Sequence, residues 1–500
     1  MVLIVGAGPT GLVLALWLTK LGVSVRIIDK AAEAGTTSRA LAVQARTLEF
    51  YRQVDIADMV VNAGVKIAGV NLWVGGTAVA RLPLGSMGEG LSHFPFVLTY
   101  GQDEHERLLA SELARLGVKV ERATELLDFE QSAHGVRARF RRPDGSEEQI
   151  DAAYLAGCDG AHSVVRHGLA AEFAGGTYSG VFYVADVRAA GPVLNQEIHV
   201  DLEEADFIAA FPLKGAGRLR LVGPASWDPG ERELTFDDVA PRAIRNLGLE
   251  ISAVNWFSTY RVHHRVAARF RGGRVFLLGD AAHVHSPVGG QGMNTGIGDA
   301  VNLAWKIAGV LKGEARESLL DTYEPERIRF ARRLVATTDR AFTLVVKQGP
   351  LARRVRTRLV PFILPLALRS RAARRVMFRT VSQIGVEYRG SAVSVGAAGR
   401  VHGGERLPWI ELEAGKDNFQ PLRSLKWQAH LYGEPAPGVA QACAEFGIEL
   451  HSFAWRDTMA RAGLARGALY LVRPDGYVGL AQVRGDARAL REYWDNIAPS

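Results

Sequence analysis

The amino-acid sequence predicts a mixed α/β (α+β) fold with more than one domain and a Rossmann-like first unit. The chain begins with a short apolar run, Val2–Val5, which leads into a glycine-rich turn and then an apolar helix. Two later segments repeat the order of apolar strand, glycine and carboxylate. With 500 residues the chain is also longer than one hydrophobic core normally organises, which predicts two or three domains.

The first unit has the GxGxxG spacing in GAGPTG, with glycines at Gly6, Gly8 and Gly11. A helix over LVLALWLTKLG follows, and then a strand over VSVRIID that ends at Asp29. Gly6 permits a tight turn, Gly8 lets a pyrophosphate approach the backbone, and Gly11 lets the helix pack on the strand. The helix N-terminus attracts phosphates, and Asp29 can accept a hydrogen bond from a ribose hydroxyl. The complete unit therefore predicts a dinucleotide site, although it does not distinguish FAD from NAD.

Four further segments carry polar residues that suit the same ligand. SRALAVQARTLEF contains Arg39 and Arg46, and GQDEHERLLASELARLG is an amphipathic helix with Gln102 near its start. AYLAGCDGAHSVVR places Asp159–Gly160 after an apolar strand, and RVFLLGDAAH places Gly279–Asp280 after another. Each segment alone is compatible with ordinary surface or turn residues, whereas the four in this order indicate one binding site.

The last of these segments continues as HVHSPVGGQGMN and then becomes a helix, in which apolar residues recur at helical spacing from Ile297 to Leu311. A partly buried helix N-terminus stabilises nearby negative charge by up to about 2 kcal/mol. The loop therefore predicts bare backbone and a positive helix end against a large flat ligand. His283 and His285 in this loop are either proton-transfer groups or packing and hydrogen-bonding residues.

GAGPTG, CDGAHSVVR and GDAAHVHSPVGGQGMNTG, taken in this order, resemble the group A flavoprotein aromatic hydroxylases, which have the p-hydroxybenzoate hydroxylase fold. SLLDTYEPERIRFA is similar to the family's helix after the third motif, and GERLPWIEL to the start of its thioredoxin-like domain. The resemblance covers essentially the whole chain and is greatest for the branch that hydroxylates phenols and polyketides. It implies a Rossmann-like FAD-binding domain, an inserted β-sheet substrate domain and a thioredoxin-like C-terminal domain.

The same resemblance gives expected domain boundaries. The parts are a discontinuous FAD-binding domain (1–70, 101–172 and 265–345), a β-rich substrate domain (71–100 and 173–264), a helical linker (346–394) and a thioredoxin-like domain (395–500). Cys443 is the only cysteine of the last domain, so no dithiol chemistry is expected there. We expect this domain to have a structural or oligomer-forming role, and a homodimer is one such assembly.

The resemblance also implies roles for individual residues. Asp29 would bind the adenosine ribose, Asp280 would hold the ribityl chain, and Asp159 would touch FAD and help NAD(P)H to dock. The implied catalytic positions, beside the flavin ring and the substrate, are Arg46, Pro287, Gly289 and Gly290. The implied FAD-binding residues are Gly6, Gly8, Pro9, Thr10, Gly11, Asp29, Lys30, Arg39, Gln102, Asp159, Gly160, Gly279, Asp280, Pro287, Gly290, Gly292, Met293 and Asn294.

The activity that the resemblance implies is a monooxygenase reaction. NADPH or NADH reduces FAD, dioxygen adds to give a flavin C4a-hydroperoxide, and a phenolic or polyketide-type aromatic substrate is hydroxylated. Because the sequence contains one GxGxxG, the nicotinamide is expected as a transient co-substrate. Two alternatives remain open: a flavin oxidase or dehydrogenase of the same fold without oxygen insertion, and a non-catalytic flavin-binding protein.

The region between the flavin motifs reads as a β-rich substrate domain. GVFYVADV, HVDLEEADFIAAFPL and RLRLVGP have partial strand alternation. In the family such a sheet covers the substrate pocket, and aromatic side chains on it either line the pocket or belong to the core. The candidate lining residues are Trp73, Phe96, Tyr100, Phe207, Phe211 and Trp256.

The composition narrows the range of partners. The formal net charge is +7 and the pI is about 9.4, but the arginines are scattered and no nucleic-acid-binding motif accompanies them, which argues against nucleic acid. Cys158 and Cys443 lie far apart and outside any CxxC, so we expect neither a disulfide framework nor a metal site, and a cytoplasmic location. The apolar N-terminus lacks the basic leader of a signal peptide.

The densest basic stretch is Leu351–Arg379. The apolar run LVPFILPLAL inside it is too short to span a bilayer and contains Pro361 and Pro365. Two interpretations remain open: helices that brace the larger domains with solvated arginines, or a helix that contacts a membrane surface or a partner.

Overall fold

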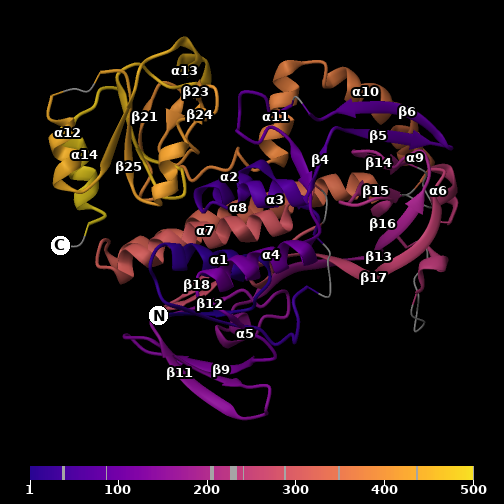
Figure 1. The fold of residues 1–500 in the computed structure, drawn as a ribbon, viewed down its shortest axis with the longest axis horizontal. Helices are drawn as coiled ribbons and strands as arrows, with labels where there is room; N and C mark the ends of the chain where they lie inside the picture. The colour runs from indigo at the N-terminus through magenta and orange to yellow at the C-terminus, as the bar shows by residue number, and fades with distance from the viewer. Residues whose placement is uncertain are drawn as a thin grey trace.

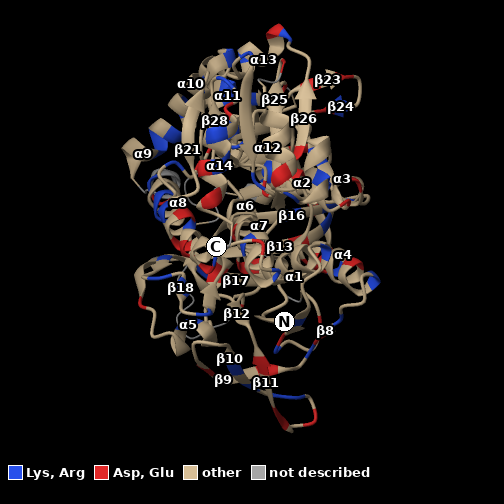
Figure 2. Cartoon of the chain, turned by 90° about the vertical axis from the view of Figure 1, so that its left-hand side faces the viewer, with Lys and Arg blue, Asp and Glu red and all other residues tan. Residues whose placement is uncertain are grey.

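The computed structural model describes residues 1–35, 40–85, 87–202, 208–225, 234–239, 241–286, 289–346, 349–434 and 437–498. The predicted α/β (α+β) class is confirmed, because parallel and antiparallel sheets are both present and helices pack against them (Figure 1). The C-terminal part of the chain lies at the opposite end of the molecule from residues 125–152 (Figures 1 and 2).

The first strands form a parallel sheet of the Rossmann type. β1 (Val2–Val5) pairs in parallel with β2 (Val25–Ile28) and with β12 (Tyr154–Gly157), and β12 pairs in parallel with β19 (Val275–Leu277). β1, β12 and β19 are fully buried, which explains why they are continuous apolar runs. The sheet order is β18-β19-β12-β1-β2-β8, with β8 at Val120–Glu121 and β18 at Arg271–Gly272.

Helices and a small sheet cover the two faces of this parallel sheet. On one side lie α1 (Pro9–Lys20), α4 (Gln102–Arg115) and α7 (Gly292–Leu311) (Figure 1). On the other side lies α5 (Val164–Gly168) with a three-stranded antiparallel sheet of β9 (Glu125–Gln131), β10 (Val136–Arg141) and β11 (Glu147–Ala152).

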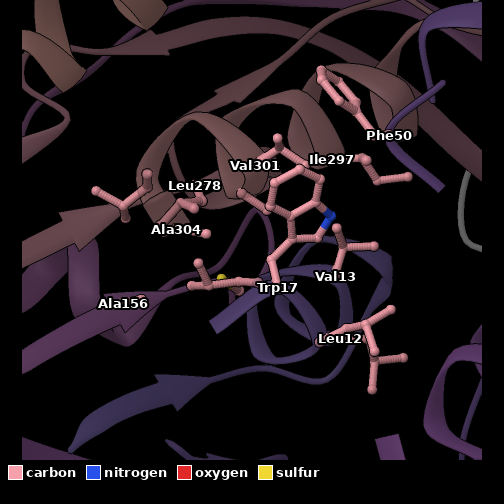
Figure 3. Close-up of a cluster of buried hydrophobic side chains, with 14 of the residues drawn as sticks. Leu12, Val13, Trp17, Phe50, Ala156, Leu278, Ile297, Val301 and Ala304 are labelled. Carbon is pink, nitrogen blue, oxygen red and sulfur yellow. The ribbon is translucent and has the colours of Figure 1, made fainter. Parts of the chain in front are cut away.

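The centre of the hydrophobic core lies where α1 meets α7 (Figure 3). Trp17 of α1 is 0% exposed and lies beside Val13, with Ile297 and Val301 of α7 next to its ring. Phe50 makes an edge-to-face contact with Trp17 at a centroid separation of 6.3 Å. The indole N–H of Trp17 has no hydrogen-bond partner among the described residues, so this side chain stabilises the fold through its apolar contacts.

Replacing Trp17 by alanine is expected to destabilise the protein by about 3–5 kcal/mol, because a large cavity would remain between two helices that cannot close it. Trp17→Phe should cost much less, since it keeps an aromatic ring and removes an unpaired buried N–H. Denaturant unfolding of the two variants measures this order. Equal loss from both substitutions would contradict the packing role.

Two long strands connect this part to a second, eight-stranded sheet. β13 (Phe173–Ala190) and β17 (Glu250–Ala267) have 18 residues each and pair antiparallel. β20 (His283–Val284), which follows the third glycine motif, pairs with the end of β17. The other strands of this sheet are β16 (Arg218–Pro224), β15 (Ile208–Pro212), β14 (Glu197–Asp201), β5 (Gly69–Val74) and β6 (Thr77–Pro83), and a separate small sheet holds β3 (Ala42–Val43), β7 (Val97–Thr99) and β4 (Val65–Ile67).

The C-terminal part contains a mixed six-stranded sheet with its own apolar clusters. The predicted turn at Arg473–Gly476 joins two of its strands, and the N–H of Gly476 donates to the carbonyl of Arg473 at 2.8 Å. Cys443 and Cys158 are both buried and unpaired. The elements are β21 (Val395–Ala398), β22 (Val401–His402), β25 (Gln428–Tyr432), β26 (Glu449–Phe453), β27 (Ala468–Val472), β28 (Val478–Gln482), α12 (Val439–Glu445), α13 (Asp457–Ala462) and α14 (Ala487–Asp495).

Helices connect the parallel sheet to the C-terminal part. α8 (Tyr323–Val346) packs along α7, and α9 (Pro350–Arg354), a π-helical turn (Val355–Leu359) and α10 (Val360–Ala367) follow it. α10 packs on β6 at the edge of the eight-stranded sheet (Figure 1). α11 (Arg371–Val381) then leads toward the C-terminal sheet.

Candidate functional site

Four sequence motifs meet at one edge of the parallel sheet. The last residues of β2, β1, β12 and β19 lie opposite one another in the strand register. The chain therefore leaves these four strands at the same level, through Asp29, Gly6, Asp159 and Gly279. In open parallel sheets, ligands bind at this carboxyl edge.

The GxGxxG turn combines two glycines that packing requires with one that faces open space. Gly6 has φ +102°, and a Cβ on it would lie 2.3 Å from the carbonyl oxygen of Cys158. A Cβ on Gly11 would lie 2.0 Å from the carbonyl oxygen of Gly6. A Cβ on Gly8 would meet nothing within 4 Å. Gly8 precedes α1, whose first turn has no side-chain cap and no acidic residue, so its N–H groups are available to a phosphate.

Asp29 closes this turn and keeps part of its carboxylate exposed. Its Oδ2 accepts from the N–H of Ala7 at 2.6 Å, and its Oδ1 accepts from the N–H of Ala31 at 2.7 Å. Nη1 of Arg122 lies 3.6 Å from Oδ2. The neighbouring Lys30 is exposed and has no hydrogen bond among the described residues. The geometry lets Asp29 order the turn and still accept from a ligand hydroxyl.

Gln102 and a residue that the sequence analysis missed, Arg220, hold Ala40 from two sides. Oε1 of Gln102 accepts from the N–H of Ala40 at 3.0 Å. Nη1 of Arg220 donates to the carbonyl of Ala40 at 2.9 Å. Ala40 directly follows Arg39, which lies outside the described residues. No local sequence pattern identifies Arg220, because it is one arginine within an ordinary strand.

Asp159 carries a buried oxygen that lacks a partner. Its Oδ2 accepts from the N–H of Val165 at 3.2 Å, whereas its Oδ1 is buried and has no hydrogen-bond partner among the described residues. Burial raises the pKa of Asp159 above its ordinary value. A Cβ on the adjacent Gly160, at φ +78°, would meet nothing within 4 Å. An unpaired acceptor next to open space is expected where a ligand donor binds, because orphaned buried polar atoms are costly.

The turn at Gly279–Asp280 packs directly on the GxGxxG turn. A Cβ on Gly279 would lie 2.6 Å from Oγ1 of Thr10, and a Cβ on Gly296 would lie 2.3 Å from the same oxygen. Thr10 therefore fits between the third motif and α7 only because both positions are glycine. Asp280 is exposed at this corner. The two glycine motifs and the α7 helix thus form one continuous surface.

The glycine loop before α7 is bare backbone, as predicted. Gly289 and Gly290 have φ of +79° and +60°, and a Cβ on Gly290 would lie 2.6 Å from the Cβ of Ala42. Helix α7 starts at Gly292 without a side-chain cap and without an acid in its first turn. Pro287 lies outside the described residues. The half-buried Met293 packs against the main core.

Asn294 fixes this loop with its side chain. Nδ2 donates to the carbonyls of Ala42 and Gly290 at 2.9 and 2.8 Å. Oδ1 accepts from the N–H of Gln44 at 2.9 Å and from Oγ1 of Thr47 at 2.7 Å. These four bonds use the ordinary capacity of an amide. Asn294 can therefore meet the expected cofactor through its backbone, while its side chain positions the loop.

The two histidines of the loop differ in their surroundings. Nε2 of His283 lies 2.8 Å from Oδ2 of Asp299, and the ring stacks on Phe270, so His283 has a packing and hydrogen-bonding role. Nδ1 of His285 lies 2.8 Å from the carbonyl oxygen of Ser286, while Nε2 is buried and has no partner in the part of the chain that the structure describes. Burial lowers the pKa of His285 to about 4, so it is neutral at pH 7. Neutral His285 can accept a hydrogen bond at Nε2 but is a weak proton acceptor.

A buried network that the sequence analysis missed holds the N-terminus of α7. Asp299 Oδ1 accepts from Nε of Arg327 at 2.6 Å, and Oδ2 accepts from the N–H of Gly279 at 2.9 Å. Nη2 of Arg327 donates to the carbonyl of Thr295 at 3.0 Å, and its Nη1 donates to the hydroxyl of Tyr388 at 2.7 Å. The available signal was an acid inside the apolar helix TGIGDAVNLAWK, which is rare unless the acid is paired.

Arg46 is buried among residues of α2 (Ala45–Gln53) and of the C-terminal part. Its Nη1 donates to Oε2 of Glu49 at 2.8 Å, and its Nη2 donates to the carbonyl of Asp475 at 2.5 Å. The guanidinium also lies over the rings of Phe50 and Tyr477. Its contacts among the described residues are therefore at the junction with the C-terminal part, and its position near the flavin and the substrate stays a prediction.

Two of the predicted aromatic residues share a sheet face with an ion pair. Trp256, Asp186, Arg220 and Phe211 are successive cross-strand partners, so their side chains lie on one face. Nε and Nη2 of Arg220 donate to the two oxygens of Asp186 at 2.6 and 2.7 Å. Because Arg220 also binds Ala40, this face is directed toward the glycine motifs.

The remaining predicted aromatic residues have other environments. Trp73 packs with the cluster of Ala185 and Val187, on the opposite face of the sheet from Phe211 and Trp256, as expected of the core alternative. Tyr100 is 5% exposed and its hydroxyl donates to the carbonyl of Glu104, as a core residue does. Phe96 packs on the main core under Lys66. Phe207 lies outside the described residues.

Comparison with known proteins finds one matching family and several similar enzymes. Residues 1–338 match the family described as FAD binding domain. The chain is 34% identical over 521 residues to the 6-methylpretetramide 4-monooxygenase of Streptomyces rimosus, which covers 98% of this chain and 92% of that protein. It is 35% identical over 362 residues to the pentachlorophenol 4-monooxygenase of Sphingobium chlorophenolicum, with 70% and 65% covered. The solved structure of the anhydrotetracycline hydroxylase OxyS from Streptomyces rimosus matches with a TM-score of 0.79 at 28% identity, with 99% and 98% covered.

Proposed function

The chain belongs to the FAD binding domain family, and we propose that this FAD-dependent monooxygenase hydroxylates a phenolic or polyketide-type aromatic substrate. In this proposal NAD(P)H supplies the electrons as a transient co-substrate, and O2 supplies the inserted oxygen atom. The observation that carries the proposal is the convergence of four glycine and carboxylate motifs at one sheet edge, below a sheet face that carries aromatic side chains.

The residues of this edge fit FAD. Gly8 leaves open space in front of uncapped N–H groups, which suits a pyrophosphate. Asp29 suits a ribose hydroxyl, the unpaired Oδ1 of Asp159 suits a donor of the cofactor, and Asp280 is exposed where the ribityl chain would pass. When bound, FAD supplies the redox and oxygen chemistry, and the protein supplies binding, orientation and electrostatics.

The N-terminus of α7 supports the chemistry through its charge. Its first N–H groups have no side-chain cap and no neighbouring acid, so negative charge that develops on an adjacent ring is stabilised. Gly290 lets the loop lie against Ala42, because a Cβ at Gly290 would lie 2.6 Å from the Cβ of Ala42. Arg327 and Asp299 keep the helix end in position, since both are buried and bonded to its backbone or to each other.

The substrate is expected beneath the face of the eight-stranded sheet that bears Phe211 and Trp256. Their rings offer apolar surface to an aromatic compound and exclude water from the reacting atoms. The Asp186–Arg220 pair lies between them and can orient a phenolic hydroxyl or a carbonyl through charge-assisted hydrogen bonds. This arrangement supports an aromatic ring that carries oxygen substituents as the substrate.

Turnover with labelled dioxygen tests the proposed reaction. We expect phenols and fused-ring quinones screened with NADPH to include compounds that accelerate its oxidation, and the product mass to increase by one labelled oxygen atom. An oxidised product without the label would favour the oxidase or dehydrogenase alternative. If no compound of either class accelerates NADPH or NADH oxidation, the non-catalytic alternative is favoured.

A further inference from the structure

The segment from Pro350 to Ala367 presents an apolar side to solvent. α9, the π-helical turn and α10 follow one another without a break in this segment. Six of its large apolar side chains are exposed although the chain is folded. Their exposed fractions are Leu351 75%, Val355 42%, Leu359 47%, Phe362 71%, Ile363 49% and Leu366 53%. Contiguous exposed apolar side chains of this kind mark an interaction surface.

These six side chains lie on one face of the helical segment, because they are spaced by three and four residues, with Ile363 next to Phe362. Val360 and Leu364 project from another side and pack, half-buried, against the main core. The segment is therefore held by one face and offers its other apolar face to a partner. The interpretation as bracing helices with solvated arginines explains the packed face of the segment. It does not explain the exposed apolar face.

Arginines border the exposed apolar face. On a helical projection Arg356 lies at one edge of the face, and Arg354 and Arg358 lie at the other. The chain contains no aspartate or glutamate between Asp339 and Glu387. Figure 2 shows Lys and Arg along the α9–α11 side of the molecule. An apolar stripe between cationic edges is typical of helices that lie in the interface of an anionic membrane.

We propose that this face, Leu351 to Leu366, docks the protein on the surface of an anionic lipid membrane. The aliphatic and aromatic side chains would enter the boundary of the acyl chains, and the arginines would pair with lipid phosphates and carboxylates. Among the described residues no helix is long and apolar enough to cross a membrane, so the segment lies on the surface. A second copy of this chain is a poorer partner, because a two-fold contact would place arginines opposite arginines without a carboxylate in the segment.

Vesicle flotation of the FAD-loaded protein tests this proposal. We expect it to float with vesicles of phosphatidylcholine and phosphatidylserine and to float much less with phosphatidylcholine alone. The variant Leu359→Gln, Phe362→Ser, Leu366→Gln should lower the partition coefficient by roughly tenfold or more, because three apolar side chains would no longer enter the acyl-chain boundary. The variant Arg354→Gln, Arg356→Gln, Arg358→Gln should lower it as well, and added salt should have the same effect.

A matched control removes exposed apolar side chains elsewhere. Val395 and Val483 are 45% and 59% exposed in the C-terminal part, and Val395→Ser with Val483→Ser should leave flotation unchanged. Unchanged FAD absorbance shows that each variant is folded. The proposal is overturned if the protein does not bind anionic vesicles or if the apolar variant binds as the parent does. It is also overturned if light scattering reveals a dimer that the Phe362→Asp variant dissociates, since a second copy would then cover the face.

Discussion

Replacing Gly8 by valine is expected to give a folded protein without the yellow colour of bound FAD. The backbone at Gly8 is extended, and a Cβ there meets no protein atom within 4 Å, so the larger side chain fits the protein itself. It occupies the space in front of the N–H groups of α1, where the pyrophosphate would lie. Losing two charge-assisted hydrogen bonds at about 1.5–3 kcal/mol each would weaken FAD binding by roughly two to four orders of magnitude.

Visible absorption after purification and titration with FAD measure this loss, and circular dichroism verifies that the variant is folded. Gly85→Val is the matched control, because a Cβ on Gly85 also meets nothing within 4 Å and Gly85 lies outside the four motifs. This control should keep its FAD. A Gly8→Val protein that binds FAD as tightly as the parent would contradict the assignment of the first glycine motif.

Replacing Glu326 by glutamine is expected to destabilise the protein by about 3–5 kcal/mol, because it leaves the buried Lys306 without its carboxylate and Arg473 with Asp475 alone. Glu326 is 0% exposed and accepts from Nζ of Lys306 at 2.8 Å. Its two oxygens also accept from Nη1 and Nη2 of Arg473 at 2.8 and 3.0 Å. Arg473 belongs to the C-terminal part, so the loss would loosen that part from α7 and α8. Thermal and denaturant unfolding measure it.

The same substitution should change the acid stability of the protein. Burial alone would raise the pKa of Glu326, but Arg473 and Lys306 together lower it well below its ordinary value. A carboxyl with a lowered pKa contributes stability above about pH 4.5, its value in the unfolded chain, and loses that contribution as the pH falls. The difference between the parent and Glu326→Gln should therefore be largest near neutral pH and decrease below about pH 4.5.

A surface carboxylate provides the control for this prediction. Glu445 binds Arg491 with both oxygens, at 2.8 and 2.9 Å, but the pair lies in solvent. Water screens exposed pairs, so Glu445→Gln should leave the unfolding midpoint unchanged within error. If the two substitutions had equal effects, the buried network would not be what joins the C-terminal part to the helices.

The FAD-binding edge could be predicted from the sequence because its signals are local. Gly6, Gly8 and Gly11 are needed for the backbone geometry of one short turn. An acidic residue after an apolar strand marks the carboxyl end of that strand. The parallel order of β2, β1, β12 and β19 then brings the motifs together without further information. Asp159 and Gly279 therefore lie where the sequence order placed them.

The sheet face proposed for the substrate and the supporting network could not be predicted in the same way, because they depend on the register between distant segments. Asp186 and Arg220 meet only because β13 and β16 pair with one particular offset. Trp73 and Trp256 are the same type of residue and differ in the sheet face on which they lie. A register shift of one residue would move each side chain to the other face. The contact of Arg46 with Asp475 could not be predicted for a related reason, since the two residues are 429 positions apart in the chain.

The strands β13 and β17 have a mechanical consequence. Both strands run without a chain break from the end beside β20, which follows Gly279–Asp280, into the eight-stranded sheet. Backbone hydrogen bonds pair them on both sides of the irregularity at Thr177–Val181. A hinge motion between the parallel sheet and the eight-stranded sheet would have to bend this pair of strands, whose register shifts between Thr177 and Val181. Main-chain pairing of β13 and β17 thus sets the distance between the sheet face that bears Trp256 and the proposed FAD site. If the register between β13 and β17 shifted by two residues, Trp256 would move by about 7 Å. In the proposed reaction, a different ring carbon of the substrate would then face the reacting oxygen.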